Sequence, residues 1–178
     1  MRHLKSTFFM LCLVLCCGIQ GQAQYYSEDF SGQWQRSKAY TLAMLDSLAK
    51  DELDYRPTAE VMSLREEFNH LMNNFGFLQY YVTGEKANEL TDYLRNNPPK
   101  SKQELREALI YAFDYVGSLA EKYSDEQMQQ AVPFFKEEVQ MHRLGVFLLM
   151  RNHVTHHRGR ISLMLRMLGH QPPKYVGW

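Results

Sequence analysis

Four long segments of the chain carry apolar side chains at steps of three and four residues, with mostly polar residues between them. This spacing matches the α-helical turn, in which residues three and four apart share one face. It predicts helices over residues 29–50, 63–83, 101–119 and 141–168. No stretch of the sequence alternates apolar and polar residues convincingly, so no β-strand is expected. The pattern therefore predicts an all-α fold.

Capping residues mark the ends of these predicted helices. Ser63 and Ser101 are each followed three residues later by a glutamate, the capping-box arrangement that begins a helix. Gly84 and Gly169 stand where the second and the last helix should end. A short turn of helix is expected after Ser124. Four amphipathic helices bury their apolar faces most simply in a four-helix bundle.

Residues 1–23 have the composition of a secretory signal peptide. Arg2 and Lys5 precede an apolar run over residues 8–17, and small residues follow at the cleavage-site positions within 21–23. The apolar run is shorter than the roughly 20 residues that span a bilayer, so no stable membrane span is expected. We predict that this segment is removed and that the protein is exported.

Residues 24–178 are expected to form a single mature domain that lies in the periplasm or is secreted. All three cysteines lie within the predicted signal peptide, so cysteine is excluded as a mature metal ligand or disulfide partner. Leu15, directly before Cys16, is larger than a lipoprotein signal requires there, which disfavours lipid attachment.

The predicted mature domain is close to neutral. Loss of Arg2 and Lys5 leaves 18 basic side chains against 20 acidic ones, a net charge of about −2. Such a chain lacks the basic field on which non-specific nucleic-acid binding depends. Nucleic acid is therefore not expected as a partner. The expected partner is a small-molecule substrate of unknown identity.

Two histidines in the last predicted helix, His153 and His157, have the spacing of a metal clamp. They lie four residues apart in an otherwise apolar row, so both rings can reach one ion at the roughly 2.0–2.1 Å of a zinc–nitrogen bond. His70, beside the apolar stripe of the second helix, is the best candidate for a third ligand. A single histidine at such a position is usually satisfied by hydrogen bonds, but the pair together with His70 favours a divalent metal site.

Three protein ligands would leave a coordination position open, as catalytic metal sites do. The ion would then activate water, or hold a thiol or carboxylate of a substrate. Zinc proteases with the same histidine spacing carry a glutamate directly after the first histidine as general base. Val154 occupies that position here, which disfavours a peptidase.

Several polar residues are placed to support such a site. Asn73 and Asn74 lie three and four residues after His70, so either could orient a ligand, although both also read as plain polar filler. Arg158 and Arg160 follow the second histidine of the clamp. They would receive an anionic substrate group near the metal, or else form a solvated helix face.

Two further residues of the last predicted helix bear on packing. Gly159 lies in the helix interior, where glycine costs about 1 kcal/mol relative to alanine, and this predicts close approach of another helix. His156 lies roughly 100° round the helix from His157, so it is not expected to bind the same ion.

A longer pattern links these elements: Tyr55-Arg56-Pro57, then Ser63 and His70, then His153-x3-His157-Arg158-Gly159, and finally Leu165-Arg166-x2-Gly169-x2-Pro172-Pro173. In this pattern the chain resembles the DinB-like family, related to YfiT-type proteins proposed to be metal-dependent hydrolases. The resemblance extends from about Trp34 to Trp178. Arg160 stands where that family usually has glutamine.

The resemblance implies an up-down-down-up four-helix bundle, frequently dimeric, that binds a divalent ion such as zinc or nickel. By position, its ligands would be His70, His153 and His157. Some relatives are transferases or isomerases that use bacillithiol, mycothiol or glutathione. We therefore expect an exported metal-binding protein, with hydrolase or thiol-transferase activity and a homodimer both compatible with the resemblance. The alternatives are a non-catalytic metal-binding or stress-associated module, and a helical scaffold without an ion.

Overall fold

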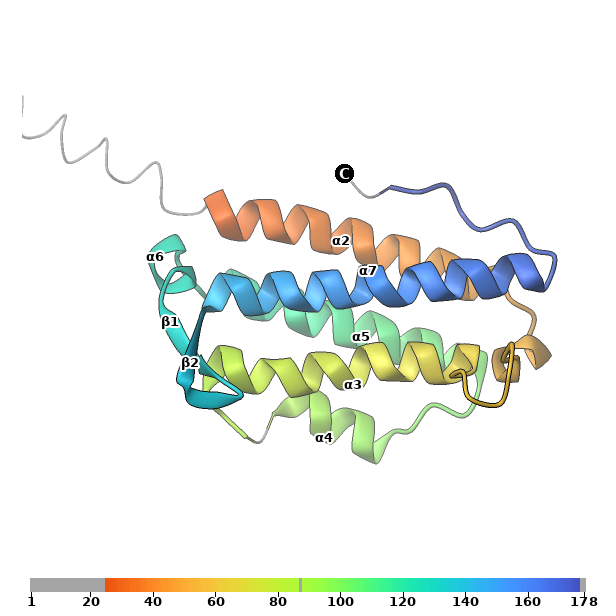
Figure 1. The fold of residues 1–178 in the computed structure, drawn as a ribbon, viewed down its shortest axis with the longest axis horizontal. Helices are drawn as coiled ribbons and strands as arrows, with labels where there is room; N and C mark the ends of the chain where they lie inside the picture. Colours follow the sequence, from red (N-terminus) through yellow and green to blue (C-terminus); the bar gives the residue numbers. More distant parts are fainter. Residues whose placement is uncertain (1–24, 87, 177–178) are drawn as a thin grey trace, which may run out of the picture.

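In the computed structural model, which describes residues 25–86 and 88–176, four long helices lie side by side (Figure 1). They are α2 (Tyr25–Asp46), α3 (Leu64–Thr83), α5 (Lys102–Glu121) and α7 (Arg143–Met167). Helices α2 and α7 run in one direction, and α3 and α5 run in the other. The predicted up-down-down-up four-helix bundle is thus confirmed. The predicted signal peptide, residues 1–23, lies outside the described residues, and the predicted domain boundary stays a prediction.

Two of the predicted helix starts form with the capping boxes that the sequence indicates. The Ser63 hydroxyl accepts the Glu66 backbone N–H at 3.3 Å, and the Glu66 carboxylate accepts the Ser63 N–H at 2.7 Å. Ser101 and Glu104 form the same reciprocal pair at the start of α5. Gly84 ends α3 in the left-handed conformation, with φ of 77°, which a glycine adopts without steric penalty.

The centre of the bundle is an aromatic cluster from three helices. The Trp34 ring lies 5.1 Å from that of Phe75 and 4.9 Å from that of Phe113, measured between centroids. Trp34 is fully buried, and its indole N–H donates to the Phe113 carbonyl at 2.8 Å. The cluster therefore fixes α2 against α3 and α5, and Phe30 on α2 extends it to Phe147 on α7, 5.2 Å away between ring centroids.

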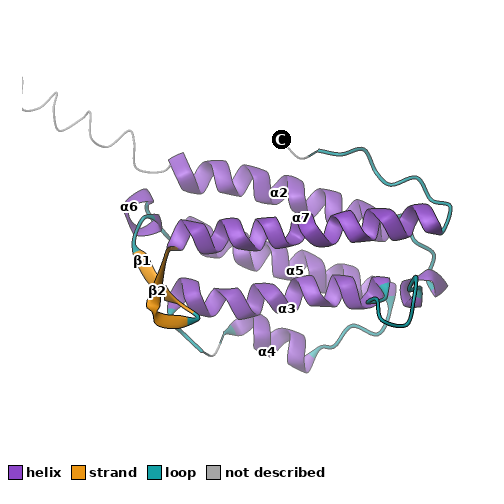
Figure 2. Ribbon diagram, viewed as in Figure 1, coloured by secondary structure: helices purple, strands orange, loops and turns teal. Residues whose placement is uncertain are grey.

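The expectation of no β-strand is wrong for the segment before α7. An antiparallel hairpin joins β1 (Ala131–Phe134) to β2 (Lys136–His142), shown in orange in Figure 2. Along β2 every side chain except Met141 is exposed. A strand without a buried face has no apolar alternation, so the sequence pattern gives no sign of it. The turn passes through Phe135, which has a positive φ of 59°.

Short helices join the long ones. The helical turn expected after Ser124 is present as α6 (Asp125–Met128), whereas α4 (Glu89–Asn96) and the 3-10 helix η2 (Asp51–Asp54) were not anticipated. Helix α4 lies in the long connection between the parallel helices α3 and α5, along the outside of α3 (Figure 1). Its N-cap residue is Asn88, whose side chain accepts the Thr91 N–H at 2.7 Å.

Glycine permits close helix packing at Gly76, not at Gly159. A Cβ atom added at Gly76 would lie 2.6 Å from the Thr91 hydroxyl, and the Gly76 carbonyl accepts a hydrogen bond from Asn88. Around Gly159 nothing lies within 4 Å of an added Cβ. The predicted close approach at Gly159 is therefore wrong, and the helix that packs most tightly on a glycine is α4.

Within the described residues, no helix combines the length and the apolar character needed to cross a membrane.

Candidate metal centre

The three predicted histidine ligands come together between α3 and α7. The ring centroid of His70 lies 5.0 Å from that of His153 and 4.7 Å from that of His157. The rings of His153 and His157 are 4.4 Å apart, as their spacing along α7 requires. One nitrogen from each ring lies within 4.8 Å of the other two. Two nitrogens bound to one ion at about 2.1 Å can be at most about 4.2 Å apart, so small side-chain rotations would complete a site.

Burial keeps the two imidazoles of α7, His153 and His157, neutral. His157 is buried, and His70 and His153 are half-buried. Burial, followed by the proximity of the neighbouring histidines, lowers the pKa of both His153 and His157 to about 4. Neutral imidazole is the form that binds a cation.

One ring nitrogen of this cluster has no hydrogen-bond partner. The Nε2 atom of His153 is buried and makes no hydrogen bond. Buried polar atoms without a partner are rare in folded proteins, and a metal ligand is one role that explains them. The donor set therefore fits a divalent ion.

A buried carboxylate, that of Glu67, contacts one of the three histidines. It is fully buried in α3, with its Oε2 atom 2.5 Å from Nδ1 of His157 and its Oε1 atom 2.8 Å from Nη2 of Arg160. Burial raises the pKa of the Glu67 carboxyl, and the positive charge of Arg160 acts in the opposite direction. Because Nδ1 of His157 faces this carboxylate, Nε2 is the nitrogen left to bind an ion.

The histidine spacing does not predict Glu67 as a site residue, although the sequence contains a signal for it. Glu67 falls between Leu64 and Leu71, next to the apolar stripe of α3 and one turn before His70. A carboxylate in that position has to be paired once it is buried. Arg160, which stands where the family that the chain resembles usually has glutamine, forms an ion pair with Glu67 and so supplies part of that pairing.

The sequence matches the model of the DinB family over residues 23–177. The chain belongs to the DinB family. No match was found among curated protein sequences.

Solved structures of similar proteins share this fold. A DinB-like protein from Bacillus cereus ATCC 10987 superposes with a TM-score of 0.71 at 20% identity, over 87% of this chain and 99% of that one. A DinB-like protein from Bacillus subtilis gives 0.66 at 18% identity, over 83% and 96%. A proposed DinB family member from Exiguobacterium sibiricum 255-15 gives 0.63 at 18% identity, over 86% and 98%. At such identities the likeness shows the fold alone.

The two asparagines expected beside the ligands differ in placement in this DinB family chain. Asn74 is half-buried, and its Oδ1 atom is buried without a hydrogen-bond partner. Its predicted role in orienting a bound group stays a prediction. Asn73 is exposed and lines a cavity of about 540 Å³ between α3 and α4.

Arg158 was expected near the three histidines, but it lies away from them. Its guanidinium donates to the Thr155 hydroxyl at 3.1 Å and lies 5.2 Å from the centre of the Tyr40 ring on α2. Helix α7 packs against both α2 and α3, and Arg158 extends toward the α2 side. The arginine that reaches the metal centre is Arg160, because its contact is with Glu67.

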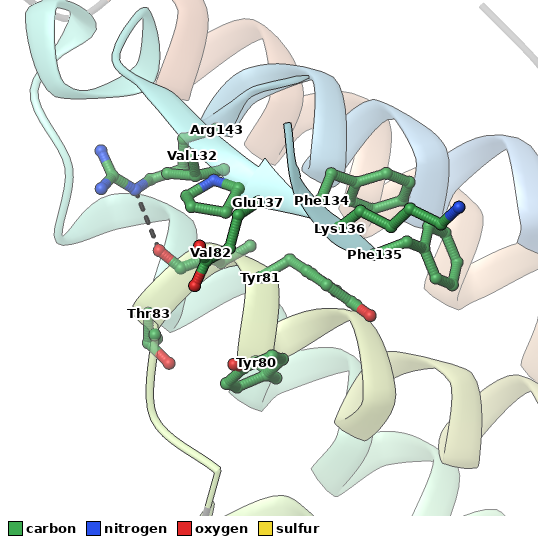
Figure 3. A pocket seen from close by; sticks show the side chains of 12 residues that line it. Tyr80, Tyr81, Val82, Thr83, Val132, Phe134, Phe135, Lys136, Glu137 and Arg143 are labelled. Carbon is green, nitrogen blue, oxygen red and sulfur yellow. Dashed lines mark hydrogen bonds between the residues drawn. The ribbon is translucent and has the colours of Figure 1, made fainter. Parts of the chain in front are cut away.

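The aromatic cavity in Figure 3 is separate from the histidine cluster. It has a volume of about 280 Å³ and lies between the end of α3, the hairpin and Arg143, whose Nε donates to the Val82 carbonyl at 3.0 Å. Tyr81 lines it, eleven residues after His70. Eleven residues of helix correspond to roughly 16 Å along the axis. This cavity is therefore not the space in front of the metal centre.

Proposed function

We propose that this DinB family protein is exported, binds a divalent ion, zinc or nickel, through His70, His153 and His157, and acts as a metal-dependent enzyme on a small molecule. The observation that carries the proposal is the convergence of one nitrogen from each of the three rings within 4.8 Å. The Nε2 atom of His153 supports the proposal, because it is buried without a hydrogen-bond partner and a bound ion would supply one.

The donor set favours turnover over a purely structural ion. Three protein ligands leave a coordination position for water or substrate, and the side chains of His70 and His153 are only half-buried. When bound, such an ion would polarise a substrate oxygen, or lower the pKa of a bound water or thiol so that it is deprotonated near neutral pH. Hydrolase and thiol-transferase reactions both use that chemistry.

The chain's own groups hold the site in one arrangement. Glu67 fixes the ring orientation and tautomer of His157, and Arg160 balances the charge of the buried carboxylate. Outer partners of this kind commonly change metal affinity or activity by roughly 10–100-fold when mutated.

Metal content tests the ligand assignment. Protein purified without an affinity tag, stripped with a chelator and titrated with zinc or nickel should take up one equivalent of ion. His153→Ala should abolish this uptake while the helical circular dichroism is retained. His156→Ala is the matched control, because His156 is exposed on the same helix and one residue from a ligand. Equal uptake by all three proteins would refute the assignment.

The alternative is a non-catalytic metal-binding or stress-associated module with the same ion. A structure with metal bound separates the two functions. An open coordination position that faces solvent supports an enzyme, whereas a fourth protein ligand supports the module.

Export and dimerisation are proposed from the sequence and can be tested separately. Mass spectrometry of protein from the periplasm or medium should find a chain that begins at Gln24. An intact N-terminus would contradict cleavage. Sedimentation analysis of the mature chain measures its oligomeric state directly.

A further inference from the structure

A polar cavity lies between α7 and α2, on the side of α7 away from the metal centre. Its volume is about 190 Å³, and it is lined by Arg36 from α2 and by Arg151 and Arg158 from α7. The C-terminal segment borders it through Tyr175 and runs back beside α2 and α7 (Figure 1). The described residues that line this cavity include these three arginines and no carboxylate.

This cavity is distinct from the metal centre. Arg151, Thr155 and Arg158 recur at steps of four and three residues, so they form one row along α7. At roughly 100° per residue, that row lies roughly 150° round the helix from His153 and His157. A ligand bound here would not touch the three histidines.

The burial of Arg158 is the strongest indication of a ligand. The residue is only 6% exposed, and its Nε atom is buried without a hydrogen-bond partner. Its contacts include the Thr155 hydroxyl and the face of the Tyr40 ring, and no carboxylate among the described residues forms an ion pair with it. A buried guanidinium with an unfilled donor is unfavourable unless an anion neutralises it.

The other two arginines add to the positive field of the cavity. Arg151 donates to the Gln33 side-chain carbonyl, and the Gln33 amide in turn donates to Asp29 at 2.8 Å. This chain of hydrogen bonds fixes the Arg151 side chain, and Asp29 itself does not line the cavity. Arg36 is exposed, and no described aspartate or glutamate forms an ion pair with it.

We propose that this arginine cavity binds the phosphate or carboxylate group of a small molecule. The planar guanidinium fork matches the paired oxygens of either group, and hydrogen bonds between ionised partners are the strong ones. The cavity is large enough for such a group together with part of the molecule that carries it. The proposal does not depend on the metal centre.

Calorimetric titration of the full chain with inorganic phosphate and with succinate, at constant ionic strength set by chloride, tests this. Saturable binding is expected for at least one of the two, and their comparison identifies the preferred group. Arg36→Gln and Arg151→Gln should each weaken binding by about tenfold or more, as loss of a charge-assisted hydrogen bond does. Both side chains lie near the surface, so these variants should fold. Arg166→Gln, an exposed arginine of the same helix, should bind like the unaltered chain.

Two further variants decide where the anion binds. His153→Ala should bind phosphate normally; binding that is lost in this variant and kept in Arg36→Gln would place the anion at the metal centre and overturn the proposal. A chain without residues 177 and 178 should also bind normally. A gain of about tenfold or more on that deletion would mean that the chain's own end competes for the cavity, against a free ligand. Absence of saturable binding by the unaltered chain would also overturn the proposal.

Discussion

The carboxylate of Glu67 contacts Nδ1 of His157 at 2.5 Å, from a position with no solvent exposure. This pair joins α3 to α7 at the level where His70 faces the clamp on α7. The other carboxylate oxygen of Glu67, Oε1, lies 2.8 Å from Nη2 of Arg160. The pair is therefore both an interhelical contact and the support for one metal ligand.

Replacing Glu67 by glutamine should weaken metal binding by roughly 10–100-fold, because the His157 ring loses a charged acceptor that orients it and raises its basicity. Competition with a chelator of known affinity measures the change. Glu66→Gln is the matched control, since glutamine can still form the capping box at the exposed start of α3. Equal metal affinity in the two variants would contradict a supporting role for Glu67.

The metal-free protein should become less stable as the pH falls from about 6.5 toward about 4. The pKa of His153 and of His157 is lowered to about 4 in the folded chain, so between these pH values the unfolded chain binds more protons. The stabilisation is present above the ordinary histidine pKa and is lost in acid. Urea denaturation at several pH values measures the slope.

Substitution of single histidines assigns that slope. His153→Gln should reduce the pH dependence between these limits, whereas His142→Gln, which changes an exposed histidine, should retain it. If both variants keep the full slope, other groups control the acid sensitivity.

Gly76→Ala should destabilise the fold by about 1–3 kcal/mol, because the new methyl group would lie 2.6 Å from the Thr91 hydroxyl oxygen. Adding Thr91→Ala to the same chain removes that oxygen and should restore much of the loss. Denaturant unfolding of the two single variants and the double variant measures the coupling. Simple additivity would show that the two helices can separate here without strain.

Gly159→Ala should have the opposite effect and stabilise the protein by up to about 1 kcal/mol. The position is helical, and an added Cβ meets nothing within 4 Å, so alanine removes backbone entropy from the unfolded chain without a clash. The midpoint of urea unfolding should rise. A fall in this midpoint would reveal a contact that the monomeric fold does not contain, such as one in a dimer.

The bundle could be predicted because its helices are amphipathic and carry their own caps. Periodicity and the serine–glutamate boxes are local features, so the sequence alone specifies α3 and α5 closely. The hairpin and α4 could not be predicted in this way. The exposed face of β2 carries no apolar pattern, and α4 has only Leu90 among its buried residues.

The candidate metal centre divides in the same manner. The spacing of His153 and His157 follows from the helical turn, so the sequence by itself determined that both rings share a face of α7. Only the tertiary structure decided that α3 faces them with His70, that Glu67 lies buried beneath His157, and that Arg160 rather than Arg158 reaches this carboxylate. The physical reason is that periodicity fixes which side chains share a face of one helix, whereas the packing of the whole core fixes how each helix is rotated against its neighbours.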